Sequence, residues 1–270
     1  MIRVENLTFS YPDGPEVLSD INLDFDMRST AIIGQNGAGK TTFAKLLKGL
    51  LKPFIGDIYI GDTNVRDTSA AMLAGKIGLV FQNPNDQIFK SRVLDEVMFG
   101  PLNIKLDKQT ARKKAIEALK ITGLADKLEV NPHDLSLSEK KLLCMASVLA
   151  MDTDIFILDE PTIAQDHTGK ETIRKIIQSL KERNKLVMTI IHDMDFAAEN
   201  FERIIVFNGG KAILDGDASF VFGQKDILQQ ARVEAPAAAR LAEELGLAGT
   251  FLTEEELIKD LRQCGERAQL

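Results

Sequence analysis

The chain has 270 residues, of which 44% are apolar and 27% are charged, and its formal net charge is −7. This length suggests one large domain, or a domain with a small annex, and the composition is that of a chain with a buried core. An acidic chain lacks the basic surface of general nucleic-acid binders, so we expect no nucleic-acid partner. Two distant cysteines without CxxC spacing argue against a disulfide framework or a zinc site and favour a reducing compartment.

No apolar run in the sequence approaches the ~20 residues that a membrane-spanning helix needs. The N-terminus also lacks the apolar core of a signal peptide. We therefore expect neither a transmembrane segment nor a signal peptide, so that any role at a membrane comes through partners.

The first thirty residues predict strands, because Ile21, Leu23 and Phe25 alternate with polar residues and so share one buried face. The apolar run 31–33 then leads into a glycine-rich stretch at 34–39. This order predicts a buried strand that ends in a glycine-rich turn.

The chain from there to residue 216 mixes amphipathic helices with apolar strands. Apolar residues at spacings of three and four predict helices at 43–50 and 173–180. Short apolar runs predict strands at 77–81, 155–159, 186–191 and 204–207. Such alternation predicts an α/β fold, in which a parallel sheet carries helices on both faces.

Two regions depart from this alternation. The stretch from about 83 to 151 is mostly helical, and we interpret it as a helical subdomain inserted into the sheet domain. The pattern is helical again near the C-terminus, where the sequence at 253–256 is a capping box that starts a further helix. We therefore divide the chain into a domain at 1–216 and a C-terminal helical extension at 217–270.

A glycine-rich motif carries the clearest chemical signal. The stretch 34–41 matches G-x-x-x-x-G-K-[S/T] between a predicted strand and a predicted helix, the context of a P-loop. The backbone N–H groups of a P-loop bind phosphate oxygens beside a helix N-terminus. Lys40 is placed to reach the β- and γ-phosphates, and the Thr41 hydroxyl to bind Mg²⁺. The predicted nucleotide-binding residues here are Gly34, Gln35, Asn36, Gly37, Ala38, Gly39, Lys40, Thr41 and Thr42.

Two carboxylates follow the predicted strand 155–159. A buried strand that delivers Asp159 beside a P-loop suits a Walker B aspartate, which holds Mg²⁺ through water. Glu160 points the other way, toward the place of an attacking water, and is the predicted general base. His192 closes another strand and could contact the γ-phosphate and orient the water, although a lone histidine at a strand end is more often a surface residue.

These motifs occur in the order that is typical of the nucleotide-binding domain of ABC transporters, and the resemblance covers residues 2–216. Three further stretches resemble, more closely, the ATPases of energy-coupling factor (ECF) transporters, which import vitamins or metal ions such as cobalt and nickel: 81–87, 95–100 and the stretch after 215. The motifs that carry the resemblance are Tyr11, the P-loop, Gln82, Leu135-Ser136, Asp159-Glu160, Asp166 and His192.

The resemblance implies a P-loop ABC ATPase fold, with an N-terminal antiparallel β-subdomain, a RecA-like parallel-sheet core, the inserted helical subdomain and the C-terminal extension. It also implies ATP and Mg²⁺ as ligands. Tyr11 would stack on adenine, and Gln82 would meet Mg²⁺ and the attacking water while sensing a membrane partner. Ser136 would contact the nucleotide of a partner's P-loop, and Asp166 would lie in the D-loop along the dimer interface. Alternatively, Tyr11 packs on Pro12 and Gln82 is a polar turn residue.

The implied activity is ATP hydrolysis that powers uptake of a vitamin or transition-metal ion, as two such domains close head to tail around two ATP molecules. The implied partners are a second ABC ATPase subunit, an integral membrane coupling subunit and a substrate-binding membrane subunit. The chain would then lie at the cytoplasmic face of the cell membrane. The alternatives are a mainly regulatory or structural ABC subunit and a non-transport ABC ATPase of the DNA-repair type. The latter inserts long coiled coils, and no sustained heptads occur here.

The signature departs from the family's usual Leu-Ser-Gly-Gly-Gln, because 135–139 read Leu-Ser-Leu-Ser-Glu. Leu137 and Ser138 would hinder close approach to the phosphate opposite. Glu139 would add a repulsion of about 3 kcal/mol if its charge stood ~6 Å from a phosphate at an effective dielectric of ~20. Gln165, in the D-loop, also replaces the family's common Leu. We therefore predict an asymmetric heterodimer with one weak site, and neutral drift is the alternative.

Overall fold

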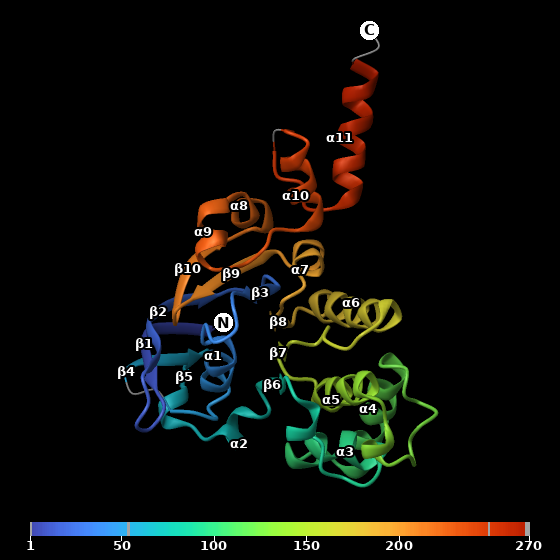
Figure 1. Cartoon of the computed structure of the whole chain (residues 1–270). Helices are drawn as coiled ribbons and strands as arrows, with labels where there is room; N and C mark the ends of the chain where they lie inside the picture. The colour runs from blue at the N-terminus through green and yellow to red at the C-terminus, as the bar shows by residue number, and fades with distance from the viewer. Residues whose placement is uncertain (1, 53–54, 248, 268–270) are drawn as a thin grey trace.

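The computed structural model describes residues 2–52, 55–247 and 249–267, which form two sheets and several layers of helices (Figure 1). The strands are β1 (Ile2–Ser10), β2 (Glu16–Phe25), β3 (Thr30–Ile33), β4 (Ile55–Ile60), β5 (Thr63–Asn64), β6 (Ile77–Val80), β7 (Ile155–Asp159), β8 (Leu186–Ile190), β9 (Arg203–Asn208) and β10 (Lys211–Gly216). The α-helices are α1 (Lys40–Leu47), α2 (Ala70–Leu73), α3 (Val93–Asn103), α4 (Lys108–Ile121), α5 (Leu137–Met151), α6 (His167–Glu182), α7 (Met194–Asn200), α8 (Ala218–Gly223), α9 (Lys225–Gln230), α10 (Ala237–Glu244) and α11 (Glu254–Arg267). Within these ranges, no helix has the combined length and apolar character that would let it cross a bilayer.

The two sheets differ in direction. The N-terminal sheet has the order β2-β1-β4-β5 and is antiparallel. The central sheet has the order β10-β9-β3-β8-β7-β6 and is parallel except for its edge pair β9 and β10. The loops that follow β3, β6, β7 and β8 therefore leave from the same edge of the sheet. The predicted α/β fold with an antiparallel N-terminal subdomain is confirmed.

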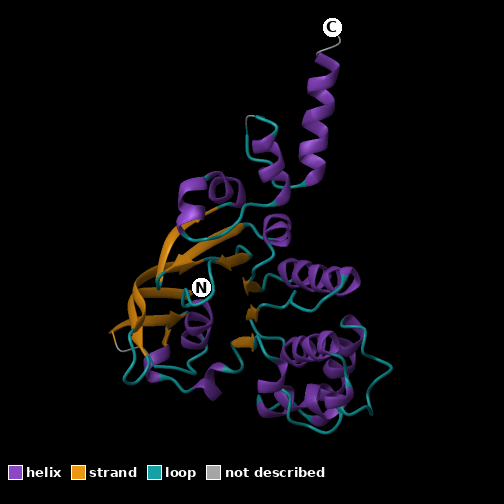
Figure 2. Ribbon diagram, viewed as in Figure 1, coloured by secondary structure: helices purple, strands orange, loops and turns teal. Residues whose placement is uncertain are grey.

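Helices cover both faces of the central sheet. Figure 2 shows α1 between the two sheets, and α5, α6 and α7 on the opposite side of the central strands. The buried side chains form matching clusters. Phe43 of α1 and Met188 of β8 belong to the cluster between the sheets. Leu143 of α5 and Ile176 of α6 belong to the cluster on the other face.

The helical subdomain consists of α3, α4 and α5, which lie between β6 and β7 in the sequence and pack on one another. Its interior is built from small and aliphatic residues such as Val97, Ala115 and Leu143, all of them fully buried. In Figure 1 it forms the lower right lobe, and α5 connects it to the sheet. The signature residues begin α5, so the position of this helix sets the position of the signature.

The C-terminal stretch has two parts that pack differently. The helices α8 and α9 bury Phe222 and Leu228 in the same cluster as the central sheet. The helices α10 and α11 share a small cluster of their own, with Ala242 and Leu257 at its centre. Figure 1 shows α11 leading away from the rest of the chain. The helices α8 and α9 therefore pack with the central sheet, while α10 and α11 bury residues in a cluster of their own.

Gly78 of β6 marks a close approach between the central sheet and α5. A Cβ atom added there would lie 2.1 Å from Cγ1 of Val148 and 3.1 Å from Oγ1 of Thr153. Because Val148 is buried and stiff at its branched Cβ, we expect Gly78→Ala to lower the free energy of unfolding by about 1–3 kcal/mol. Urea unfolding would measure this. Gly75→Ala is the control, since a Cβ there meets nothing within 4 Å. Equal effects of the two variants would contradict this account of the packing.

Candidate functional site

The P-loop joins β3 to α1 through glycines in the left-handed region. Gly34, Gly37 and Gly39 have φ values of 144°, 80° and 96°. A Cβ atom at Gly34 would lie 2.1 Å from the carbonyl oxygen of Phe207, so this position admits no side chain. Nothing lies within 4 Å of a Cβ added at Gly37, which leaves that side of the turn open. Residues 36–42 line a cleft of about 300 Å³, at the start of α1, where backbone N–H groups can bind an anion.

Lys40 is the first residue of α1, and its side chain folds back into the P-loop. Its Nζ donates to the carbonyl oxygens of Gly34 at 2.6 Å and Gln35 at 2.9 Å. The residue is only 6% exposed, and burial lowers the pKa of its ammonium, while Glu160 and Asp159 act in the opposite direction. The ammonium therefore lies among oxygen atoms inside the cleft.

Asp159 ends β7 beside the P-loop, and its residue is 2% exposed. Burial raises the pKa of its carboxyl to about 6, although a hydrogen bond with Thr41 acts in the opposite direction. Its Oδ1 is a buried atom for which the described part of the chain offers no hydrogen-bond partner. An unpaired carboxylate oxygen beside a hydroxyl fits Mg²⁺, which prefers oxygen ligands and usually adds substrate phosphates to one or two protein ligands.

The described residues hold no group of three or more Cys, His, Asp or Glu side chains that could bind a metal by themselves. The Mg²⁺ ligands predicted from the sequence are a hydroxyl, an amide and one carboxylate, from Thr41, Gln82 and Asp159. A set of this kind suits an ion that phosphate oxygens help to hold.

The three predicted catalytic residues meet where β6, β7 and β8 end. The Nε2 of Gln82 donates to Oε2 of Glu160 at 2.6 Å. The Nε2 of His192 lies 3.1 Å from Oε1 of the same carboxylate. Glu160 is 6% exposed, and it lines the P-loop cleft together with Gln82. The structure therefore places the predicted base at the cleft, with one partner for each of its oxygens.

The surroundings of His192 favour its neutral imidazole. Burial and the nearby charge of Lys40 lower its pKa, against the opposing effect of Glu160. A neutral imidazole with its proton on Nε2 can donate to Oε1 of Glu160. The side chain thus acts as a hydrogen-bond donor to the predicted base.

The backbone of Glu160 is also held in place. Its φ is 51°, which is uncommon for a residue with a side chain, and its N–H donates to the carbonyl of Ile190 at 2.9 Å. Its own carbonyl accepts from Nζ of Lys141 at 2.6 Å, and Lys141 is 4% exposed. The sequence analysis missed this contact. The feature that could have indicated it is a lysine placed directly before the apolar run that starts at Leu142.

Tyr11 does not line the P-loop cleft, but it contacts a residue that does. Its hydroxyl lies 3.2 Å from Oγ1 of Thr42. Its ring is edge-on to that of Phe9, with 5.0 Å between centroids, and 39% of the residue is exposed. An aromatic ring thus stands exposed at the rim of the P-loop, as stacking on a base requires.

Ser136 lies away from the P-loop of its own chain. It is the exposed N-cap of α5, in the helical subdomain. The residues that line the P-loop cleft include none from 135–139. The signature therefore does not complete the P-loop cleft within one chain, and it remains open to another molecule.

The unpaired charge expected at Glu139 is not found. Its side chain and that of Ser136 form a capping box, in which the Ser136 N–H donates to Oε2 at 2.9 Å. Its other oxygen forms an ion pair with Lys127. Hydrogen bonds from Lys127 and then from Ser136 lower the pKa of the Glu139 carboxyl to about 2. The ion pair with Lys127 therefore reduces the repulsion of about 3 kcal/mol that the charge of Glu139 alone would exert.

Comparisons with known proteins identify the family. Residues 18–163 match the family model described as ABC transporter. This chain belongs to the ABC transporter family. It is 39% identical to the energy-coupling factor transporter ATP-binding protein EcfA of Carboxydothermus hydrogenoformans, over 90% of each chain. It is 38% identical to EcfA1 of Leuconostoc mesenteroides, over 96% of each chain. The resemblance to the ECF type of ABC ATPase is confirmed.

Solved structures agree with this assignment. CbiO1 of Clostridium perfringens, described as part of the ABC transporter complex cbiONQ, aligns with a TM-score of 0.74 and 32% identity, over 91% of this chain and 98% of that one. The ATP-binding cassette MJ0796, in a dimeric post-hydrolysis state with ADP and Pi, aligns with a TM-score of 0.75 and 28% identity. That alignment covers 80% of this chain and 98% of the cassette.

The raised pKa of Asp159 predicts that its charge lowers the free energy of unfolding of the nucleotide-free protein in a pH-dependent way. The carboxyl is neutral in both states below about pH 4, and above about pH 6 only the folded state buries its charge. A rise in pKa from 3.8 to about 6 corresponds to at most about 3 kcal/mol. We therefore expect Asp159→Asn to raise the free energy of unfolding above pH 6, with the gain vanishing below pH 4.

Thermal unfolding at several pH values, without nucleotide or Mg²⁺, would measure this gain. The exposed Asp62 provides the control, because Asp62→Asn removes the same charge from the surface. A pH-independent gain, or the same gain in both variants, would contradict the assigned burial cost.

Proposed function

We propose that this chain is the ATP-binding and ATP-hydrolysing subunit of an ECF-type ABC importer, which powers uptake of a vitamin or a transition-metal ion. The observation that carries the proposal is the pairing of Glu160 with Gln82 and His192 at the P-loop cleft. The relatives named as ECF transporter ATP-binding proteins support it, because they match almost the whole chain.

The residues of the chain divide the work of hydrolysis. The P-loop N–H groups and Lys40 bind the phosphates, and Tyr11 stacks on the base. Glu160 accepts the proton of the attacking water, while Gln82 and His192 hold its carboxylate toward the cleft. Thr41, Gln82 and Asp159 would hold Mg²⁺, whose charge would offset that of the phosphates.

Hydrolysis needs a second ATPase subunit in this proposal. The cleft contains no signature residue of its own chain, whereas Ser136 is exposed on a separate lobe. Two chains that meet head to tail would let each signature complete the other's P-loop. The dimeric form of MJ0796 supports this arrangement. ATP would close the pair and hydrolysis would release it.

An asymmetric heterodimer remains our proposal, for a steric reason. Leu137 is 49% exposed at the first position of α5, next to Ser136, where its side chain hinders approach of a phosphate. The partner's P-loop would therefore face a weak signature, while the P-loop of this chain would face a normal one. Glu139 no longer contributes to this argument, since Lys127 compensates its charge. Neutral drift, and a mainly regulatory subunit, are the competing interpretations.

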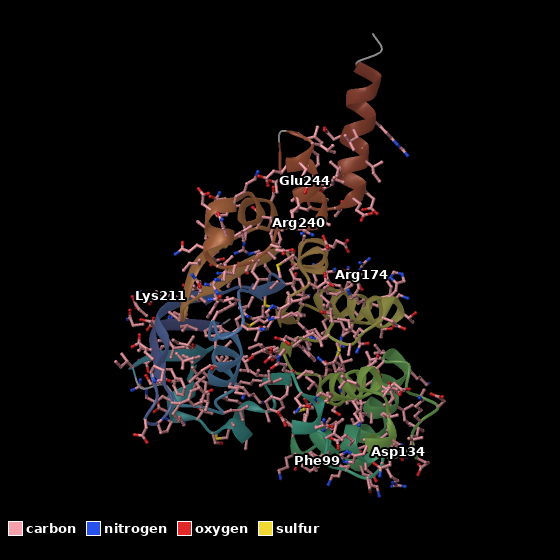
Figure 3. The ribbon with its side chains drawn as sticks, in the orientation of Figure 1. Phe99, Asp134, Arg174, Lys211, Arg240 and Glu244 are labelled. Carbon is pink, nitrogen blue, oxygen red and sulfur yellow. The ribbon has the colours of Figure 1, made fainter. Side chains whose placement is uncertain are left out.

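A groove of about 490 Å³ between the sheet domain and α3 suits the membrane coupling subunit. Its lining is mainly apolar, and the exposed rings of Phe89 and Phe99 pack edge to face at its mouth, 4.6 Å apart. The groove also contains Phe81, which directly precedes Gln82. Figure 3 places Phe99 at the lower edge of the molecule, away from the C-terminal helices. A helix docked here could act on Gln82, and through it on Glu160.

The partners proposed in full are the second ATPase subunit, the integral membrane coupling subunit and a substrate-binding membrane subunit. The chain would lie peripherally at the cytoplasmic face of the membrane, held there by the coupling subunit. The solute would be recognised by the membrane subunits, because the nucleotide-site residues do not contact it.

We expect Glu160→Gln to lower ATP turnover of the purified complex by roughly 10²–10⁴-fold, because the variant removes the base and keeps the shape of the side chain. A phosphate-release assay would measure it. Glu117→Gln, on the exposed face of α4, is the matched control and should leave turnover unchanged. Turnover near the wild-type level in Glu160→Gln would contradict the role of Glu160 and with it the proposed function of this site.

The asymmetry has its own test. The equivalent Glu→Gln change in the partner ATPase should lower turnover far less than Glu160→Gln does, because it silences the weak site. Equal losses would refute the asymmetry. Leu137→Gly should then speed the weak site, because it removes the hindering side chain and keeps Ser138, and an unchanged rate would favour neutral drift.

The groove predicts a variant that separates binding of the membrane partner from binding of ATP. We expect Phe99→Glu to weaken association with the membrane subunits about tenfold or more, because it places a charge in an apolar contact. Nucleotide affinity should not change. The control is Ile121→Glu on α4, where the side chain is 50% exposed and lies outside the groove. Copurification would measure association, and full retention of the membrane subunits by Phe99→Glu would rule out this groove.

A further inference from the structure

Two departures from the family pattern lie against each other, although 27 residues separate them. Ser138 is the second residue of α5, and Gln165 directly precedes the N-cap of α6. The Oγ of Ser138 donates to Oε1 of Gln165 at 2.8 Å, and Nε2 of Gln165 donates to the Ser138 carbonyl at 3.2 Å. Each residue is both donor and acceptor for the other. The family has Gly and Leu at these positions, and neither residue has a polar side chain that could form this pair.

Gly169 provides the space that Gln165 occupies. A Cβ atom added at Gly169 would lie 2.1 Å from Oε1 and 3.1 Å from Cδ of Gln165. Gly169 lies in the first turn of α6, where glycine is less stable than alanine. Its N–H donates to Oδ1 of Asp166 at 2.8 Å, which caps the helix. Packing therefore explains the glycine at position 169, because any side chain there would displace the Gln165 amide.

A second polar contact ties the same face of α5 to the same loop. Lys141 is three residues after Ser138, so the two side chains lie on one face of the helix. The buried ammonium of Lys141 donates to the carbonyl of Glu160 at 2.6 Å. Helix α5 is thus hydrogen-bonded to both ends of the segment 160–165. Figure 1 shows α5 and α6 on the same side of the central sheet.

The pair lies beside the residue that would meet a partner's nucleotide. Ser136 is the N-cap of α5, two residues before Ser138, and its capping box with Glu139 fixes the first turn. Ser138 belongs to that turn, so the bond to Gln165 joins the turn that follows Ser136 to the loop before α6. The altered signature is therefore a connected structure, in which the polar side chains that depart from the family pattern have partners.

We infer that Ser138 and Gln165 form one unit that positions the signature turn on the D-loop. Gln165 is then a positioning residue for the composite site that the partner's P-loop completes. The inference rests on the proposed function, since that site exists only in a dimer. It explains the unusual signature and the unusual D-loop as one matched change rather than two independent losses.

A double-mutant cycle in the purified complex with the partner ATPase tests the unit. Ser138→Ala, Gln165→Leu and the double variant are compared in a complex that carries Glu160→Gln, so that the remaining cleavage comes from the other site. We expect each single variant to slow single-turnover ATP cleavage about fivefold. The double variant should be no slower than either, because the second change removes nothing further. A loss of about 25-fold, as independent effects would give, overturns the inference.

A conservative variant distinguishes positioning from general destabilisation. Ser138→Thr keeps the hydroxyl and should retain cleavage close to the unsubstituted complex, while Ser138→Ala should not. Equal loss in both would overturn the inference. If Glu160→Gln alone leaves overall turnover at the wild-type rate, the proposed function fails. If Glu160→Gln slows turnover and the effects of Ser138→Ala and Gln165→Leu are additive, only the inference is overturned and the proposed function stands.

Hydrogen exchange of the complete chain needs neither partner nor nucleotide. Gln165→Leu should speed exchange of the amides at 137–140 at least severalfold, because it frees the first turn of α5. Gln178→Leu is the control, since the Gln178 amide donates to Glu182 within α6 rather than to α5. Unchanged exchange at 137–140 in Gln165→Leu overturns the inference even if the partner is never isolated.

Discussion

The site depends on the burial of ionisable groups in a small space. Lys40, Asp159 and Glu160 are each at most 6% exposed, and buried charges are stable only when they have partners. Lys40 finds its partners in the P-loop carbonyls, and Glu160 finds its own in Gln82 and His192. Only Asp159, among these groups, keeps an unpaired oxygen. The unpaired oxygen of Asp159 thus lies where a metal ion would bind. Binding of that ion would therefore stabilise the folded protein.

The order of the parallel strands brings these groups together. Asp159 is paired with Ile190 in the register of β7 and β8, so the next residue of each strand leaves the sheet at the same level. Glu160 extends this pairing through its N–H bond to Ile190, and its positive φ then turns the chain away from the strand direction. Glu160 therefore lines the P-loop cleft, whereas Asp159 is buried beside the P-loop. A single local conformation separates the proposed metal ligand from the proposed base.

Local patterns predicted much of this, and contacts between distant residues accounted for what was missed. The P-loop was predictable because its glycines, Lys40 and flanking elements are consecutive. Of the capping box predicted at 253–256, one hydrogen bond forms, in which the Glu256 N–H donates to Oγ1 of Thr253. The Glu256 carboxylate accepts from the N–H of Leu252 rather than from that of Thr253. The compensation of Glu139 could not be predicted, because Lys127 lies twelve residues away in the loop that follows α4. The packing of α8 and α9 on the central sheet likewise depends on tertiary contacts.

The segment from Glu160 to Gln165 contacts both the P-loop cleft and the signature turn of this chain. Its first residue is the proposed base for the P-loop of this chain, and its last residue accepts a hydrogen bond from Ser138 in the turn that follows Ser136. Lys141 joins the signature helix to the carbonyl of that base. A movement of α5 on binding a partner's nucleotide would therefore pull on both ends of a six-residue segment. Since the Glu160 backbone already has an uncommon conformation, such a movement would alter the direction of its carboxylate. The two sites of a dimer would then be coupled within each chain, through hydrogen bonds rather than through the distant nucleotide itself.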